Sequence, residues 1–417
     1  MTNLLSTTVL CSSVLMLTIA ESRRLGSLLT PFTTIAWPLA AISLIVNAVA
    51  VHMDFFPVTP RVNYFILLNL FLIWMVGYVM TPRQGEPFQR PDYQSIFSEF
   101  RRFKPILIAL SWVVIAIVFQ RVLSLLAAKD WWFIASEEFE ELIVLGLAAH
   151  MVQLAKVLVI LLITILWNQK KSWLDKITIT CLILCIIAIK VKYHLIWTVL
   201  IIFFIKNLML ERNLQLRKML VIVSSVICIF IANYLFMFFA FTEFSFGNQG
   251  MWRFIIGWLF NYLLSGPILL DKWMELSFTE EWWVPFIVFL NIKNVITGNP
   301  ERLSGVTNVN PGFDYVSPEY ISNVGTSFGA YYLIGGFFFT LLSSVLIAIA
   351  AYYFYYKIRQ KPGPIVIFIA SVFLTMTTLS FFGQYFTLLS VYEMTAFYII
   401  LVSLFKSINY LSPPGKA

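Results

Sequence analysis

Long apolar runs, each bounded by polar or charged residues, follow one another along most of the chain. A helix of about 20 apolar residues crosses a bilayer core, so these runs predict membrane-spanning helices. Eleven spans are predicted, near residues 2–20, 30–51, 62–80, 105–127, 143–166, 176–189, 193–209, 218–241, 326–355, 364–383 and 385–405. The sixth and seventh runs are short and nearly continuous, which favours a tilted hairpin or a re-entrant pair. The predicted fold class is an all-α polytopic membrane protein.

Composition agrees with this class, because 60% of the 417 residues are hydrophobic and only 12% are charged. Soluble domains carry about 25% charged residues. The four cysteines lie inside apolar runs and show neither a disulfide framework nor metal-ligand spacing. The first run is followed, not preceded, by Arg23 and Arg24, which is the reverse of a secretory signal. We therefore expect a retained first helix with its N-terminus outside.

The net charge of +8 is informative by position, because cytoplasmic loops of membrane proteins are enriched in lysine and arginine. With the N-terminus outside, most of the 29 lysines and arginines fall in predicted cytoplasmic segments, among them 83–104 and 206–218. The opposite orientation would place most of them outside. We expect a cytoplasmic C-terminus and no nucleic-acid partner.

One predicted outside segment, residues 242–325, is much longer than the others. It separates an N-terminal bundle of about eight spans (1–241) from a C-terminal bundle of about three (326–417). Its aromatic stretch 251–264 is typical of a helix at the membrane interface. We expect the following Ser265-Gly266-Pro267 to end that helix, since proline cannot continue the hydrogen-bond ladder.

Basic residues on the predicted outer side are exceptions to the charge sorting, and they are candidates for binding an anion. Arginine offers paired hydrogen bonds and lysine a point charge, which suits phosphate or pyrophosphate. The alternative is that these side chains only reach the membrane interface. The candidates are Arg121, His150, Lys190, Lys192, Arg253, Lys272 and Arg302.

Acid–base chemistry has weaker candidates, since each is also an ordinary loop acid or helix cap. They are Glu243, Asp271, Glu275, Asp314 and His194. Lys156 lies deep in its span, on a face shared with Gln153 and His150, and Glu393 is a possible partner. No metal-binding, P-loop or glycine-rich nucleotide motif is found, and we expect neither metal nor cofactor.

Two local patterns carry a resemblance to a known family: "FNYLLSGPILLDKW" (260–273) and "NVGTSFGAYYLIGGFFFTLLSSVLIAIAAYYFY" (323–355). Together with the number of spans and the large loop before the last three, they resemble the O-antigen (oligosaccharide repeat-unit) polymerases. The resemblance covers nearly the whole layout. Where that family often has an acid at the span entry, this chain reads "SFGAYYLIGG", so no catalytic carboxylate is assigned there.

The resemblance implies a glycosyltransferase of the bacterial inner membrane, acting at the periplasmic face on oligosaccharide units linked to undecaprenyl pyrophosphate. It implies that the cationic set holds pyrophosphate, with Arg253 among the catalytic residues. Asp271, Glu243 or His194 would act as a base. The tryptophans Trp252, Trp258, Trp282 and Trp283 would stack on sugar rings or anchor lipid. A flippase and a chain-length-determinant protein are the implied partners.

Four alternatives remain open from the sequence. An O-antigen ligase shares the layout but transfers finished polymer. A flippase or other transporter would carry charges through many spans, whereas the charges here gather at the outer side. Polyprenyl-phosphate-sugar transferases typically have an acidic pair in the first outside loop, where this chain has only Asp54. A structural membrane protein without activity is the fourth.

Overall fold

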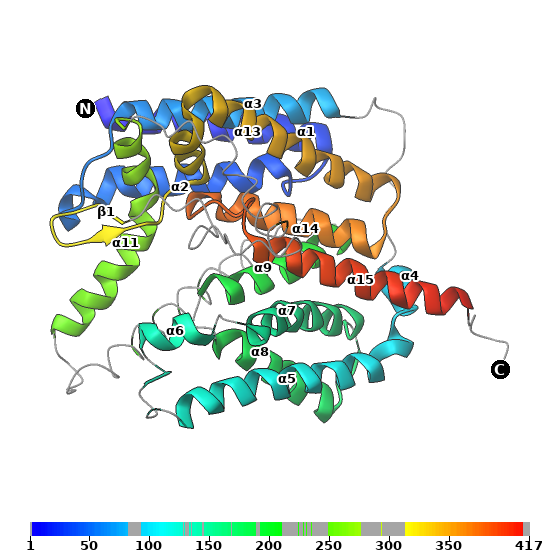
Figure 1. The fold of residues 1–417 in the computed structure, drawn as a ribbon. Helices are drawn as coiled ribbons and strands as arrows, with labels where there is room; N and C mark the ends of the chain where they lie inside the picture. Colours follow the sequence, from blue (N-terminus) through cyan, green and yellow to red (C-terminus); the bar gives the residue numbers. More distant parts are fainter. Residues whose placement is uncertain are drawn as a thin grey trace. The chain divides into compact units, whose positions relative to one another are not determined.

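A computed structural model describes the chain in two compact units, each treated by itself (Figure 1). The described residues are 2–81, 93–127, 129, 133–134, 136–143, 146–167, 169–188, 192–210, 249–276 and 313–411, with 224, 228, 231, 235 and 293 as single residues. Unit 1 comprises Met1–Phe88, Trp252–Lys357 and Val372–Leu389. Unit 2 comprises Gln89–Met251, Ile358–Ser371 and Ser390–Ala417.

Ten of the eleven predicted spans are helices at the expected places. They are α1 (Thr2–Leu25), α2 (Pro31–Val49), α3 (Pro60–Met80), α5 (Lys104–Ala127), α7 (Leu147–Ile165), α8 (Trp173–Ala188), α9 (Lys192–Leu210), α13 (Ser327–Gln360), α14 (Pro364–Thr378) and α15 (Leu389–Leu411). The remaining predicted span, 218–241, which is the eighth along the chain, lies outside the described residues apart from isolated positions. Within the described ranges, nine helical stretches are long and apolar enough to cross a membrane. The all-α polytopic class is confirmed.

Shorter elements connect the spans. They are η1 (Val51–Met53), α4 (Tyr93–Ser98), η2 (Arg101–Phe103), α6 (Glu137–Ile143), η5 (Leu379–Phe381) and the paired strands β1 (Asp314–Tyr315) and β2 (Ile321–Ser322). A further long helix, α11 (Gln249–Trp273), precedes the strands.

In unit 1, α13 runs parallel to α3, because contacts advance together along both helices. Ser344 donates a 2.7 Å hydrogen bond to the side-chain oxygen of Asn69. Eight residues further along each helix, Tyr352 packs against Gly77, where an added Cβ would lie 2.2 Å from the tyrosine ring. Glycine at this position lets the two helices approach closely, as small residues do in membrane bundles.

The Gly-Gly step of α13 is a kink inside the helix. Gly335 and Gly336 have non-helical backbone angles, and Gly336 takes φ 72° and ψ −160°, a conformation that favours glycine. Thr340, which is fully buried, donates from its hydroxyl to the carbonyl of Gly336 at 3.0 Å. The hydroxyl thereby satisfies one carbonyl at the kink, as buried backbone in a membrane requires.

Helix α11 crosses one end of unit 1, although it is long and apolar enough to span a membrane. Near its start, Tyr320 fills the space over Gly257, and near its end, Trp273 fills the space over Gly325. Both contacts are with the segment that leads into the N-terminal end of α13. The helix therefore lies across the ends of the bundle and not beside the spans (Figure 1). We call this side, which holds the N-terminal ends of α1, α3 and α13, the α11 end of unit 1.

The predicted helix end at Ser265-Gly266-Pro267 is wrong, because α11 continues through all three residues. Pro267 removes one hydrogen bond of the ladder without ending the helix. Gly266 does not form a turn; it allows α11 to approach the backbone of Phe381 closely. An added Cβ there would lie 2.5 Å from the Phe381 carbonyl oxygen. This triplet marks a tight contact between helix and loop.

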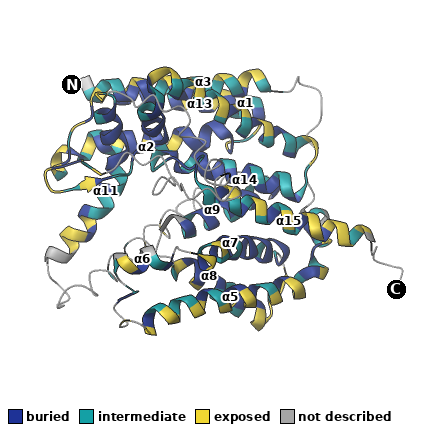
Figure 2. Cartoon of the chain, in the orientation of Figure 1, coloured by how far each residue is buried: buried dark blue, intermediate teal, exposed yellow. Residues whose placement is uncertain are grey.

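Unit 2 is built on α5, α7, α8 and α9, which pack on one another. Among the described spans α7 is the most buried, as its dark ribbon shows (Figure 2). At the start of α8, Ser172 and Asp175 exchange hydrogen bonds of 2.8 and 3.2 Å in a capping box. The Lys104 ammonium lies 2.8 Å from both oxygens of Asp175. Burial raises the pKa of Asp175, but these hydrogen bonds outweigh it, so the pKa lies below its ordinary value.

Candidate functional site

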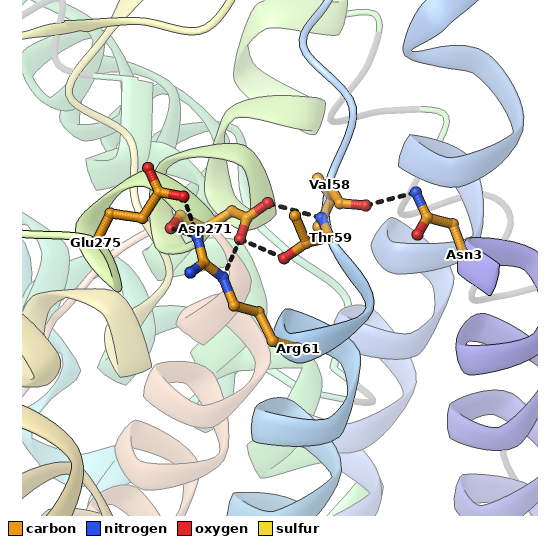
Figure 3. A network of polar contacts seen from close by, with 6 residues as sticks. All are labelled: Asn3, Val58, Thr59, Arg61, Asp271 and Glu275. Atoms are coloured by element: carbon orange, nitrogen blue, oxygen red, sulfur yellow. Dashed lines mark hydrogen bonds and ion pairs between the residues drawn. The ribbon is translucent and has the colours of Figure 1, made fainter.

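A polar network at the α11 end joins the end of α11 to the start of α3 (Figure 3). Asp271, only 6% exposed, is its centre. Thr59 donates to the Asp271 carboxylate twice, from its backbone N–H and from its hydroxyl, each at 2.6 Å. Arg61 donates from Nε to the same carboxylate at 2.7 Å. With three donors, the buried carboxylate is satisfied as an anion.

Local sequence explains how α3 presents these donors. Pro60 occupies the first position of the helix, where its missing N–H costs nothing. Thr59 is the N-cap, with extended backbone, yet its hydroxyl makes no cap to its own helix. That hydroxyl is turned to Asp271 instead, so the start of α3 is capped by a residue of another helix.

The guanidinium of Arg61 also binds the far side of the network. Its Nη2 donates to the Asp271 carbonyl at 2.9 Å and to Glu275 at 2.8 Å. Its Nη1 makes no hydrogen bond to any residue that the structure describes, and the side chain is 39% exposed. One face of a rigidly held guanidinium is therefore open to an incoming acceptor. Asp271, whose oxygens are engaged, is suited to positioning Arg61.

Lys272 lies next to this network on α11 and pairs with Asp314 of β1 at 3.0 Å. Its ammonium also stands 5.1 Å from the ring centre of Phe56. Asp271 and Lys272 are neighbours in sequence but bind different partners, Arg61 of α3 and Asp314 of β1.

Arg253 lies at the opposite end of α11, about 27 Å from Asp271 by helix rise. It is largely exposed and stands 3.6 Å from the exposed carboxylate of Glu319. Trp252 beside it is half-exposed, and Trp258 packs edge-on against Tyr320 at 6.1 Å. Burial and the adjacent carboxylate of Glu319 raise the pKa of the Tyr320 hydroxyl. Arg253 and Asp271 are therefore not one catalytic cluster.

The remaining described candidates belong to unit 2. Arg121 donates to the backbone carbonyl of Leu142 at 2.9 Å. His150 pairs with Glu393 at 2.6 Å. His194 contacts Lys156, a residue that the sequence places on the same face as His150.

Several predicted residues lie outside the described part of the chain. They are Glu243, Lys190, Arg302, Trp282 and Trp283. Lys192 begins α9, but its side chain is also outside the described atoms.

Sequence reasoning missed Arg61, which binds both Asp271 and Glu275 in the network. Its signal was its position: a lone cation in the first predicted outside loop, directly after Thr59-Pro60 and before an apolar run. The same argument that selected Arg253 and Lys272 would have selected it.

Fold and site together define a polytopic α-helical membrane protein with a polar network beneath a helix that crosses one end of a bundle. A model of the family of unknown function DUF6337 matches residues 54–410, so the chain belongs to that family. No curated protein and no solved structure matches the chain.

Proposed function

We propose that the protein is a glycosyltransferase that polymerises oligosaccharide repeat units carried on undecaprenyl pyrophosphate. The charge distribution along the sequence supports an outer, periplasmic location for the α11 end, in a bacterial inner membrane. The observation that carries the proposal is the open face of Arg61, held by buried Asp271 beneath an aromatic helix. An exposed guanidinium can donate paired hydrogen bonds to a diphosphate. An aromatic helix can lie at the membrane interface, where the lipid carrier of the sugar is anchored.

In the proposed reaction an acceptor hydroxyl oxygen forms a bond to the anomeric carbon of the growing chain. The bond between that carbon and the pyrophosphate oxygen breaks, and the hydroxyl proton leaves to a base or to water. Arg61 donates to the pyrophosphate as its charge grows, which is the role of a positioned cation in transfer reactions. The exposed carboxylate of Glu275 gives way to the diphosphate, since exposed ion pairs are worth about 0–1 kcal/mol.

A polymerase has defined partners under this proposal. The substrate is a lipid-linked oligosaccharide brought to the outer leaflet by a flippase, and a chain-length-determinant protein would set the product size. A ligase and a flippase are the rival functions, and the test below separates them.

The test is the banding of surface polysaccharide in a deletion strain, with the wild-type chain or Arg61→Ala restored at matched membrane levels. Arg23→Ala, an exposed arginine elsewhere in unit 1, is the matched control. We expect single-unit bands on deletion, a full ladder with the wild type and with Arg23→Ala, and no ladder with Arg61→Ala. Loss of all attached units would point to a ligase or flippase, and an unchanged ladder on deletion would refute the proposal.

A further inference from the structure

A second polar cluster lies inside unit 2, on the most buried of its helices. Lys156, at the middle of α7, is only 3% exposed and donates to the side-chain oxygen of Gln153 at 2.6 Å. Its ammonium nitrogen also contacts Nδ1 of His194 in α9, which is 4% exposed. Ionisable groups at this depth are costly and are usually retained for a function.

The contact between Lys156 and His194 joins two nitrogen bases, and this restricts their protons. A hydrogen bond between them needs one nitrogen to donate and the other to accept. An imidazolium Nδ1–H facing an ammonium would instead bring two donors and two positive charges together. The pair therefore holds one proton fewer than its two members can carry, and it can accept another only by breaking this contact.

A further pair leads from this centre to the edge of unit 2. His150, in the first turn of α7, is 54% exposed, and its Nδ1 lies 2.6 Å from the carboxylate of Glu393 on α15. Glu393 in turn interacts electrostatically with Lys156. The four groups thus form a series from an exposed imidazole, through a half-buried carboxylate, to the buried nitrogen pair.

Several other ionisable groups lie on elements that pack against α7 or on α15. On α5 and α8, Lys104 pairs with Asp175, and Arg121 binds a backbone carbonyl. The remaining described titratable side chains on these elements and on α15 include the thiols of Cys181 and Cys185 and the hydroxyl of Tyr392.

Charge balance argues against an anion as the ligand of this cluster. Glu393 already supplies the negative charge that a buried Lys156 ammonium requires. A bound phosphate would add negative charge beside that carboxylate. A series made of a histidine, a carboxylate and a nitrogen pair is suited to binding a proton.

We propose that unit 2 contains an exchangeable proton site, with the Lys156–His194 pair as the acceptor and the Glu393–His150 pair as its connection to water. A proton arriving on His150 passes to the Glu393 carboxylate, which becomes neutral as the imidazole returns to its neutral form. Transfer onward gives the nitrogen pair one added positive charge and restores the carboxylate. This site is independent of the glycosyl transfer proposed for unit 1.

Histidine-selective NMR on the full-length protein in detergent micelles tests the site. The chain has 3 histidines, so carbon-13 at Cε1 gives one signal each for His52, His150 and His194. Single substitutions assign the signals, and exposed His52 of unit 1 is the internal reference. In the wild type, the His194 signal is expected to change between about pH 4 and about pH 10, because its imidazole belongs to the proposed acceptor pair.

Glu393→Gln breaks the series and keeps the shape of the side chain. We expect it to move the His194 midpoint by about one pH unit, since the loss of a nearby carboxylate changes proton affinity roughly tenfold. His150→Gln is the second variant, and it should move the His194 midpoint without touching the buried pair.

Glu138→Gln is the control, because it removes an exposed carboxylate of unit 2 that stands 3.5 Å from Lys129. It should leave the His194 midpoint unchanged. A His194 signal that is constant over the whole range, or one that titrates identically in the wild type, Glu393→Gln and His150→Gln, overturns the proposal.

Discussion

The carboxylate of Asp271 accepts a 2.7 Å hydrogen bond from Nε of Arg61, although the two residues are 210 positions apart. This contact fixes the end of α11 against the start of α3. It also leaves one face of the guanidinium open beside α11. The stability of unit 1 and the function that we propose for the α11 end would therefore depend on the same pair.

We expect Arg61→Ala to destabilise the protein by about 1–3 kcal/mol, because buried Asp271 loses its charged donor. Asp271→Asn should also destabilise it, by leaving Arg61 and Thr59 with a neutral acceptor. The double variant should lose less free energy of unfolding than the two single variants lose together, since both substitutions remove the same interaction. Thermal unfolding in detergent measures all three. Strict additivity would show that the pair does not couple α11 to α3.

Arg23→Ala is the control for this series. Arg23 is an exposed cation at the far end of α1, and its removal should change stability by less than about 0.5 kcal/mol.

Gly266→Ala tests the finding that α11 continues through the Ser-Gly-Pro triplet. The added methyl carbon would lie 2.5 Å from the backbone oxygen of Phe381, which cannot move aside as a side chain could. We expect a loss of about 1–3 kcal/mol from this overpacking. Had the triplet been a free turn, alanine would be tolerated. Gly363→Ala is the control, since an added Cβ there meets no atom within 4 Å.

Much of the fold follows from the apolar pattern, because the thickness of a bilayer fixes the length of a span. The predicted runs at 62–80 and 105–127, for example, agree with α3 and α5 within two residues. Gly266 shows where such reasoning ends. By local backbone rules, the Gly266-Pro267 pair predicts the end of a helix. In the fold, Gly266 is instead required by the backbone of Phe381, more than a hundred residues away in sequence.

The candidate site was less predictable for a related reason. Position relative to the membrane selected Asp271 and Lys272, but no local rule says which distant residue binds each one. Asp271 binds Arg61 of α3 and Lys272 binds Asp314 of β1, and both partners are distant in sequence. Arg253, chosen by the same argument, lies at the other end of α11. The sequence supports a list of outer charges, and only the fold divides it into pairs.

The capping pair at the start of α8 predicts an acid-sensitive term in the stability of unit 2. The pKa of Asp175 is lowered in the folded protein, so the unfolded chain binds this proton more tightly. The stabilisation is therefore present above the ordinary pKa of about 3.9 and is lost as the pH falls below it towards the folded-state value. Unfolding midpoints measured between about pH 7 and about pH 3 should fall more steeply in the wild type than in Asp175→Asn.

Glu138→Gln supplies the comparison for this pH series. Its carboxylate is 58% exposed and 3.5 Å from Lys129, a geometry that contributes little to stability. Its unfolding midpoints should follow the wild-type curve. Equal slopes for the wild type and Asp175→Asn would show that the Lys104 contact does not favour the ionised acid.

Tyr352 donates a 2.6 Å hydrogen bond to Glu21, whose side chain is fully buried, and this pair ties α13 to α1. Tyr352→Phe keeps the ring over Gly77 but removes the donor. We expect a loss of about 1–3 kcal/mol, because a buried carboxylic group is left without its partner. Tyr353→Phe is the matched control, since the neighbouring side chain is 51% exposed and loses only an outward hydroxyl. Thermal unfolding of the two variants separates a buried hydrogen bond from a general effect of tyrosine removal. Equal midpoints would mean that Glu21 obtains its stabilisation elsewhere, with the Thr30 side chain as the first candidate and the Arg24 charge as the second.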